Sequence, residues 1–230
     1  MYRSRRFISI CIVVLAGLAM FGVSHWSSSA ATDTWIPVVS KMRETVTEIP
    51  SSGPESVTET WDGTFLRDFD GSEVRKLHRV SPSEPQETEK GTFIDRSNQN
   101  FYDLDFSTRT AVLQQSNLAG REDPYVARAK ALSLGREEEV FQGISCFVMP
   151  MDPTEFGGVT FSGKGCYSPE YDLHLYQVLN RTDKTSGLTI KTVTEMYDLE
   201  VGRAPEPDTV KLPDGFVVQE SLCSACGSEP

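Results

Sequence analysis

Short stretches of apolar–polar alternation, each closed by a turn signal, are the feature that most constrains how this chain can fold. In the first of them, Val38, Met42 and Val46 fall on one face of an extended strand, whereas Lys41 and Arg43 fall on the other. The same pattern recurs along the chain, at 55–69, 73–80, 92–96, 101–106, 110–115, 140–148, 159–167, 173–180, 188–199 and 216–218. The pattern predicts about ten strands.

The connections between these stretches are short, which favours antiparallel pairing. Asp70-Gly71 is a typical two-residue hairpin turn, and residues 97–100 and 107–108 separate further strand pairs in the same way. Asp62-Gly63 interrupts the second stretch, where we expect a bulge or a turn. The sequence therefore predicts a mainly β fold, a curved antiparallel meander in one domain over residues 31–218, because the crossover helices of a parallel sheet are missing.

One stretch, residues 124–134, has the pattern of a helix. Asp123 can cap its first turn with Pro124 at the first helical position, and Gly135 can end it. We expect one or two helices in total. A sheet of about ten strands has to curl, so that large residues on one face line either a packed interior or a cavity.

Residues 1–30 read as a signal peptide. Three arginines precede an apolar run at 7–23, and Ser28 and Ala30 stand at the −3 and −1 positions of a cleavage site after Ala30. The apolar run is near the lower limit for a membrane span, so an uncleaved anchor is the alternative. Either way the protein is expected to be periplasmic or secreted, with membrane contact only through this segment if it stays uncleaved.

The composition argues against several functions. A formal net charge of −11 disfavours nucleic acid as a partner. Three histidines in the whole chain disfavour a multi-histidine metal site, and His174, which alternates with apolar neighbours, is expected to face water. The chain has no GxSxG, HExxH or phosphate-binding glycine loop. We therefore predict a protein that is not an enzyme and needs no cofactor or metal.

Four cysteines follow the leader, and an even number in an oxidising compartment favours disulfides. Cys146 and Cys166 lie symmetrically about Phe156, which belongs to a turn-rich stretch. A hairpin with its turn in that stretch would bring the two sulfurs onto neighbouring strands. Cys223 and Cys226 form a CxxC in a C-terminal tail, residues 219–230, where a local disulfide is the simplest interpretation. Crosswise pairing, a zinc site and a redox-active CxxC remain alternatives.

The order of several weak motifs resembles that of a group of exported bacterial proteins. These motifs lie at 37–48, 64–75, 93–95, 102–105, 109–111, 140–144, 166–170, 206–208 and 212–216. The group is similar in layout to the half-open barrel of periplasmic lipoprotein carriers and envelope-stress sensors, the LolA/LolB/RseB-like superfamily. The resemblance implies an unclosed, half-open barrel and the handling of a lipid or a lipoprotein.

These observations lead to two main hypotheses and a third, weaker one. In the first, an exported non-enzymatic binding protein of the cell envelope holds a lipid or lipoprotein acyl chain on the concave face of the sheet. In the second, the chain is a structural or protein-interaction module that binds another envelope protein and no small ligand. The third is an exported thiol enzyme that uses Cys223 and Cys226.

Five alternating apolar residues are the candidate ligand contacts of the first hypothesis. They are Leu173, Leu175, Leu188, Ile190 and Met196. The alternative is that the same side chains only fill the core.

Overall fold

The computed structural model describes residues 35–81, 89–116, 118, 120 and 122–220. The predicted signal peptide, residues 1–30, lies outside the described residues, and so do Cys223 and Cys226 with most of the C-terminal tail. Cleavage after Ala30, the role of the tail and the pairing of these two cysteines therefore stay predictions.

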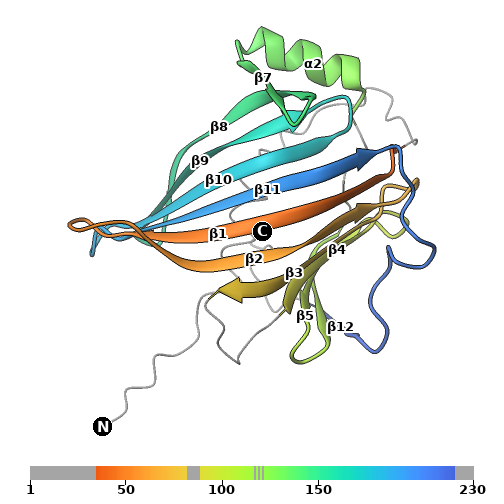
Figure 1. Ribbon diagram of the computed structural model, residues 1–230, viewed down its shortest axis with the longest axis horizontal. Coiled ribbons are helices and arrows are strands. Elements are labelled where there is room, and N and C mark those ends of the chain that lie inside the picture. The colour runs from red at the N-terminus through yellow and green to blue at the C-terminus, as the bar shows by residue number, and fades with distance from the viewer. Residues whose placement is uncertain (1–34, 82–88, 117, 119, 121, 221–230) are drawn as a thin grey trace, which may run out of the picture.

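Twelve strands and one helix make up the described structure (Figure 1). The strands are β1 (Val38–Ile49), β2 (Ser56–Arg67), β3 (Glu73–Ser81), β4 (Glu89–Asp95), β5 (Asn100–Asp105), β6 (Thr110–Gln115), β7 (Glu138–Phe141), β8 (Ile144–Phe156), β9 (Val159–Ser168), β10 (Leu173–Asp183), β11 (Thr189–Val201) and β12 (Val217–Glu220). The helix is α2 (Pro124–Ser133). The predicted mainly β class is confirmed.

All twelve strands belong to one sheet, in the order β12-β6-β5-β4-β3-β2-β1-β11-β10-β9-β8-β7. Two antiparallel meanders, β1–β6 and β7–β11, are joined where β1 pairs with β11. The chain passes from one meander to the other through α2, and β12 pairs with β6 in parallel. The predicted open, mainly antiparallel sheet is confirmed. Its strand order is not purely sequential, because the β1–β11 and β6–β12 pairings join distant parts of the chain.

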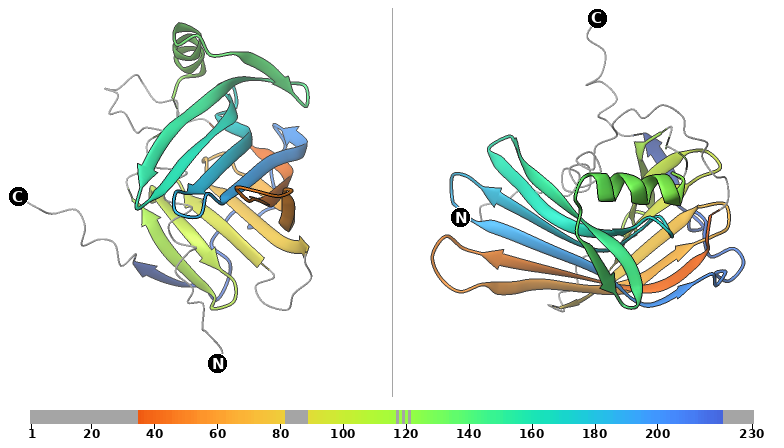
Figure 2. Two further views of the ribbon diagram at one scale, coloured as in Figure 1. Left: turned by 90° about the vertical axis from the view of Figure 1, so that its left-hand side faces the viewer. Right: turned by 90° about the horizontal axis from the view of Figure 1, so that it is seen from above.

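The sheet is curved and open, with β7 and β12 as its two free edges (Figure 2). Lys90 on β4 reaches across β3 and β2 to Glu44 on β1, where its Nζ lies 2.5 Å from a carboxylate oxygen. A lysine side chain can bridge that many strands only when the sheet bends toward it, since neighbouring strands lie about 4.8 Å apart. The face that carries Glu44 and Lys90 is therefore concave.

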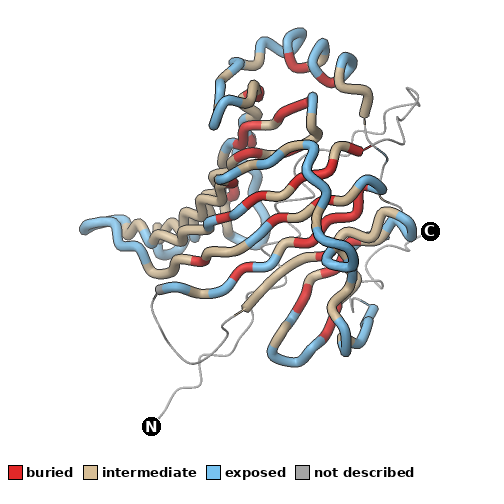
Figure 3. The backbone as a smooth tube through the Cα atoms, turned by 45° about the vertical axis from the view of Figure 1, so that its right-hand side comes forward, coloured by how far each residue is buried: buried red, intermediate tan, exposed pale blue. Residues whose placement is uncertain are grey.

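Two hydrophobic cores stabilise the sheet. The main core consists of Val38, Met42, Trp61, Phe65, Leu77, Cys146, Cys166, Leu173, Leu175 and Met196. The second core consists of Val74, Phe93, Tyr102, Leu104 and Ala111, and Val210, Leu212 and Phe216 from the segment before β12 pack against it. Figure 3 shows the buried positions concentrated across the middle of the sheet.

Local signals explain most element boundaries. The Asp123 carboxylate accepts hydrogen bonds from the backbone N–H groups of Tyr125 and Val126, as expected for the helix cap. The predicted strand at 140–148 is instead divided by a turn at Gln142-Gly143, where both residues have positive φ. This turn separates β7 from β8 and raises the number of strands.

The turn or bulge expected at Asp62-Gly63 does not fall there: β2 continues through these residues, and the register shift against β3 lies just before them, between Thr60 and Trp61. Gly63 pairs with Met42 on one side and Leu77 on the other. A Cβ at this position would overlap the backbone carbonyl of Lys76. The glycine therefore permits a close approach of β2 and β3, and it does not mark a turn.

Candidate functional site

The five predicted ligand contacts fall into two separate groups. Leu173, Leu175 and Met196 are buried together in the main core. Leu188, just before β11, and Ile190, within β11, are half-buried and belong to neither core. Contact between any of these residues and a ligand stays a prediction.

The space found beside Leu175 and Met196 is small. A void of about 20 Å³ is lined by Met42, His174, Leu175 and Met196, together with Arg75, Gln177, Thr194 and Glu195. That volume is enough for about one water molecule. An acyl chain would fit there only after core side chains had moved apart.

His174 was expected to face water, and this expectation is wrong. Its ring packs beside Tyr167, with the ring centroids 5.2 Å apart, and it lines the small void next to Arg75. Burial, together with the positive charge of Arg75, lowers its pKa to about 4. The imidazole is therefore neutral at pH 7 and acts as a packing residue.

Charged side chains close over Trp61 on the concave face. Arg79 forms an ion pair with Glu59 at 2.7 Å, and the Trp61 indole N–H donates to the same glutamate at 3.0 Å. Lys90, which pairs with Glu44, lies 4.1 Å from the centre of the Trp61 ring. This part of the concave face is filled, so a ligand could enter only by breaking two ion pairs.

Arg67 is a buried charged residue, since only 2% of its side chain is exposed. Its guanidinium pairs with Glu73 at 2.8 Å and donates to the backbone carbonyls of Tyr171 and Asp172 at 2.6 and 2.8 Å. It also lies over the Trp35 ring. These contacts tie β2 to the β9–β10 turn, so Arg67 serves the fold.

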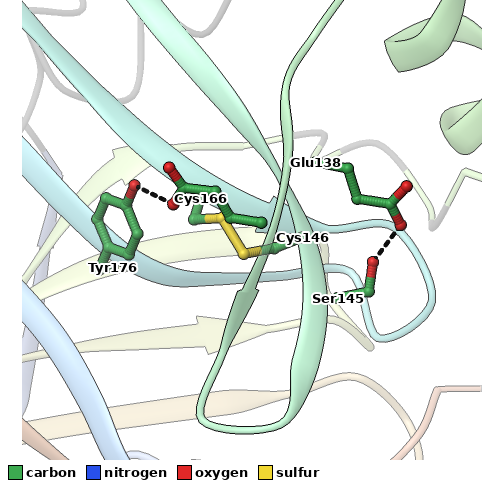
Figure 4. The surroundings of a disulfide bond; sticks show 6 residues. Glu138, Ser145, Cys146, Cys166 and Tyr176 are labelled. Atoms are coloured by element: carbon green, nitrogen blue, oxygen red, sulfur yellow. Dashed lines mark hydrogen bonds between the residues drawn. A yellow bond between two sulfur atoms is a disulfide. The ribbon is translucent and has the colours of Figure 1, made fainter.

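The predicted pairing of Cys146 with Cys166 is confirmed (Figure 4). The disulfide joins β8 to β9, with the two Cα atoms 5.4 Å apart. The register differs from the predicted one, since Cys166 lies opposite Val148 and the bond is diagonal. The turn falls at Gly157-Gly158, and a bulge after Met151 shifts the pairing further.

A larger open groove lies at the end of the sheet where β8–β11 and the last residue of β1 meet. Its volume is about 490 Å³. It is lined by Ile49, Met151, Ser162, Gly163, Lys164, Val178, Asn180 and Lys191, which we call the end groove. None of the five predicted ligand contacts lines the end groove.

The strand register explains how the end groove forms. Val178 on β10 lies opposite Lys164 on β9, and Asn180 lies between Ser162 on β9 and Lys191 on β11. Residues that are directly opposite share a face, so these five side chains project from one face of three neighbouring strands. This site could hardly be predicted from the sequence, because alternating lysines and small polar residues are also typical of an ordinary solvated strand face.

Two further observations concern metal binding and the crossing of a membrane. Within the described ranges, no three His, Cys, Asp or Glu side chains gather closely enough to hold a metal ion. In the same part of the chain, no helix has both the length and the apolar character required to cross a bilayer.

The fold and the end groove thus define a mainly β protein with one open, curved sheet and an accessible groove at the end of that sheet. No family model matches the chain, and no curated protein matches it. Among solved structures, MucB of Pseudomonas aeruginosa in complex with MucA is similar at 12% identity and a TM-score of 0.34; the match covers 75% of this chain and 55% of that chain.

Two shorter proteins match over most of their own length. A LolA superfamily protein from Nitrosomonas europaea matches at 11% identity and a TM-score of 0.30, over 73% of this chain and 87% of that one. A putative outer membrane lipoprotein-sorting protein domain from Vibrio parahaemolyticus matches at 12% identity and a TM-score of 0.29, over 75% and 88%.

Proposed function

We propose that this chain is an exported, non-enzymatic binding protein of the cell envelope that holds the hydrophobic chain of a lipid or lipoprotein in the end groove. The observation that carries the proposal is the groove itself. Its volume of about 490 Å³ lies within the range of about 300–1,000 Å³ that is typical of small-molecule sites. Ile49, Met151 and Val178 supply its apolar surface. Export is supported by the signal-peptide pattern of residues 1–30.

The end groove suits an acyl chain better than the concave face does. On the concave face, Trp61 and the ion pairs Arg79–Glu59 and Lys90–Glu44 occupy the space over β1–β4. The void beside Leu175 and Met196 has room for about one water molecule. The end groove is open to solvent and needs no core side chain to move. We therefore place the ligand at the end groove rather than against the leucines of the main core.

Binding of a fatty-acyl fluorescent probe to the purified protein tests this proposal. We expect saturable binding that is at least 10-fold weaker in Val178→Glu, because the substitution places a charge on the apolar surface of the groove. Val57→Glu is the matched control, since Val57 is 62% exposed and lies outside the groove. The proposal fails if the wild-type protein shows no saturable binding, or if Val178→Glu binds as well as Val57→Glu.

A second candidate function, a protein-interaction module, is favoured by α2. Tyr125 and Leu132 are 85% and 54% exposed, and with Ala129 their i, i+4, i+7 spacing places them on one helix face. Val140 on the neighbouring edge strand β7 is 72% exposed. The exposed apolar side chains of this helix face are of the kind that bind a partner protein.

Co-purification from the envelope fraction separates the two functions. An envelope protein that is retained by the wild-type chain and lost from Tyr125→Ser/Leu132→Ser would support the interaction module. Identical retention by both chains would remove it. The acyl-probe titration of the same variant should be unchanged in either case, because neither residue lines the end groove.

A further inference from the structure

The end groove has an unusual charge for this chain. The protein as a whole carries a net charge of −11, yet the groove is lined by two lysines, Lys164 and Lys191, and by no carboxylate. A local positive site on an acidic protein attracts an anion in spite of the overall charge when the contact is short, since the protein's more distant charges are screened by salt.

Most other lysines whose contacts are described are paired with an acid. Lys41 pairs with Asp198, Lys76 with Glu89, and Lys211 with Asp214, at 2.7–3.5 Å. Within the described residues, Lys164 and Lys191 form no ion pair. Both ammonium groups are thus available to a ligand from solvent.

The register brings suitable donors around one point. Asn180 lies directly between Ser162 and Lys191, and Lys164 is two residues from Ser162 on the same face of β9. Strands about 4.8 Å apart allow the two flexible lysine side chains to converge above Asn180. The amide of Asn180 and the hydroxyl of Ser162 can add neutral hydrogen-bond donors.

From this arrangement we infer that the end groove binds a single-chain lipid with an anionic head group. The tail lies along Ile49, Met151 and Val178, and the head group is held by Lys164 and Lys191. This inference rests on the proposed function, because the tail occupies the same groove. It adds the charge of the ligand: a neutral lipid of the same chain length should bind more weakly.

Isothermal titration calorimetry at low salt tests the inference with two lipids of equal chain length. Dodecanoate has an anionic head group, and 1-monododecanoylglycerol has a neutral one. We expect dodecanoate to bind about 10-fold more weakly to Lys164→Gln/Lys191→Gln than to the wild-type protein, as two exposed charge pairs of up to about 1 kcal/mol each would give. The neutral lipid should bind equally to both proteins.

Lys41→Gln/Lys211→Gln is the matched control, because it removes the same charge outside the groove. Its affinity for dodecanoate should equal that of the wild-type protein. If the groove variant binds dodecanoate as well as this control does, the inferred head-group site is wrong, whereas the proposed function stands as long as both lipids bind saturably. If neither lipid binds the wild-type protein, both the proposed function and this inference are overturned.

Discussion

Replacing Asp103 by asparagine should stabilise the protein at neutral pH and have almost no effect in acid. Asp103 lies in β5, opposite Thr92 on β4 and Val112 on β6, and its carboxyl group is mostly buried. Burial raises the pKa of this carboxyl from 3.8 to about 6, because the charged form loses its hydration. Asparagine has nearly the same shape and carries no charge at any pH.

The direction and the size of the effect follow from proton linkage. Below pH 3.8 the carboxyl is protonated in both the folded and the unfolded chain. Between pH 3.8 and about 6 the folded protein keeps the proton that the unfolded chain has lost, so wild-type stability falls as the pH rises through this window. Above pH 6 the full penalty is present. A pKa difference of about two corresponds to at most about 3 kcal/mol.

Urea unfolding followed by tryptophan fluorescence, measured from pH 3.5 to pH 8 on both proteins, checks this prediction. The free energy of unfolding of Asp103→Asn minus that of wild type should rise from near zero below pH 4 to between about 1 and 3 kcal/mol above pH 6. A difference that does not change with pH would refute the reasoning, because it would show that burial does not perturb the carboxyl.

Three further substitutions test the fold. Cys146→Ser should lower the free energy of unfolding by about 3 kcal/mol, the loop-closure value for two cysteines 20 residues apart, and wild type measured in reductant should lose the same amount. Arg67→Met should cost about 3–5 kcal/mol in urea unfolding, because it removes the close partner of buried Glu73 and leaves only Arg75, at 3.7 Å; Arg67→Met/Glu73→Gln should recover part of that loss. Gly63→Ala should lower the melting temperature in calorimetry, at a cost of about 1–3 kcal/mol, since its Cβ overlaps a carbonyl of β3; an unchanged melting temperature would contradict the close approach of β2 and β3.

Features that depend on neighbouring residues could be predicted from the sequence. Alternation along residues 38–48 located β1, the turn at Asp70-Gly71 separated β2 from β3, and Asp123 with Gly135 marked the two ends of α2. The spacing of Cys146 and Cys166 within one hairpin identified the disulfide. Each of these signals acts over a short stretch of chain, where backbone geometry and hydrogen bonding leave few choices.

Features that depend on distant parts of the chain could not be predicted in the same way. Nothing in residues 38–49 indicates that β1 pairs with β11, and nothing near Lys90 indicates that it reaches Glu44 across two strands. His174 alternates with apolar residues as a solvent-facing residue does, but in the folded chain it lines the small void beside Arg75. The end groove arises in the same way, from residues of five strands that carry no shared motif.

Methyl NMR on the protein with ¹³C-labelled methionine methyl groups tests the central claim most directly. Met151 lines the end groove, whereas Met42 and Met196 lie in the main core beside the small void. On titration with dodecanoate, the Met151 signal should shift in a saturable manner while the Met42 and Met196 signals stay in place. Shifts at Met42 and Met196 without a shift at Met151 would place the ligand in the core and contradict the account.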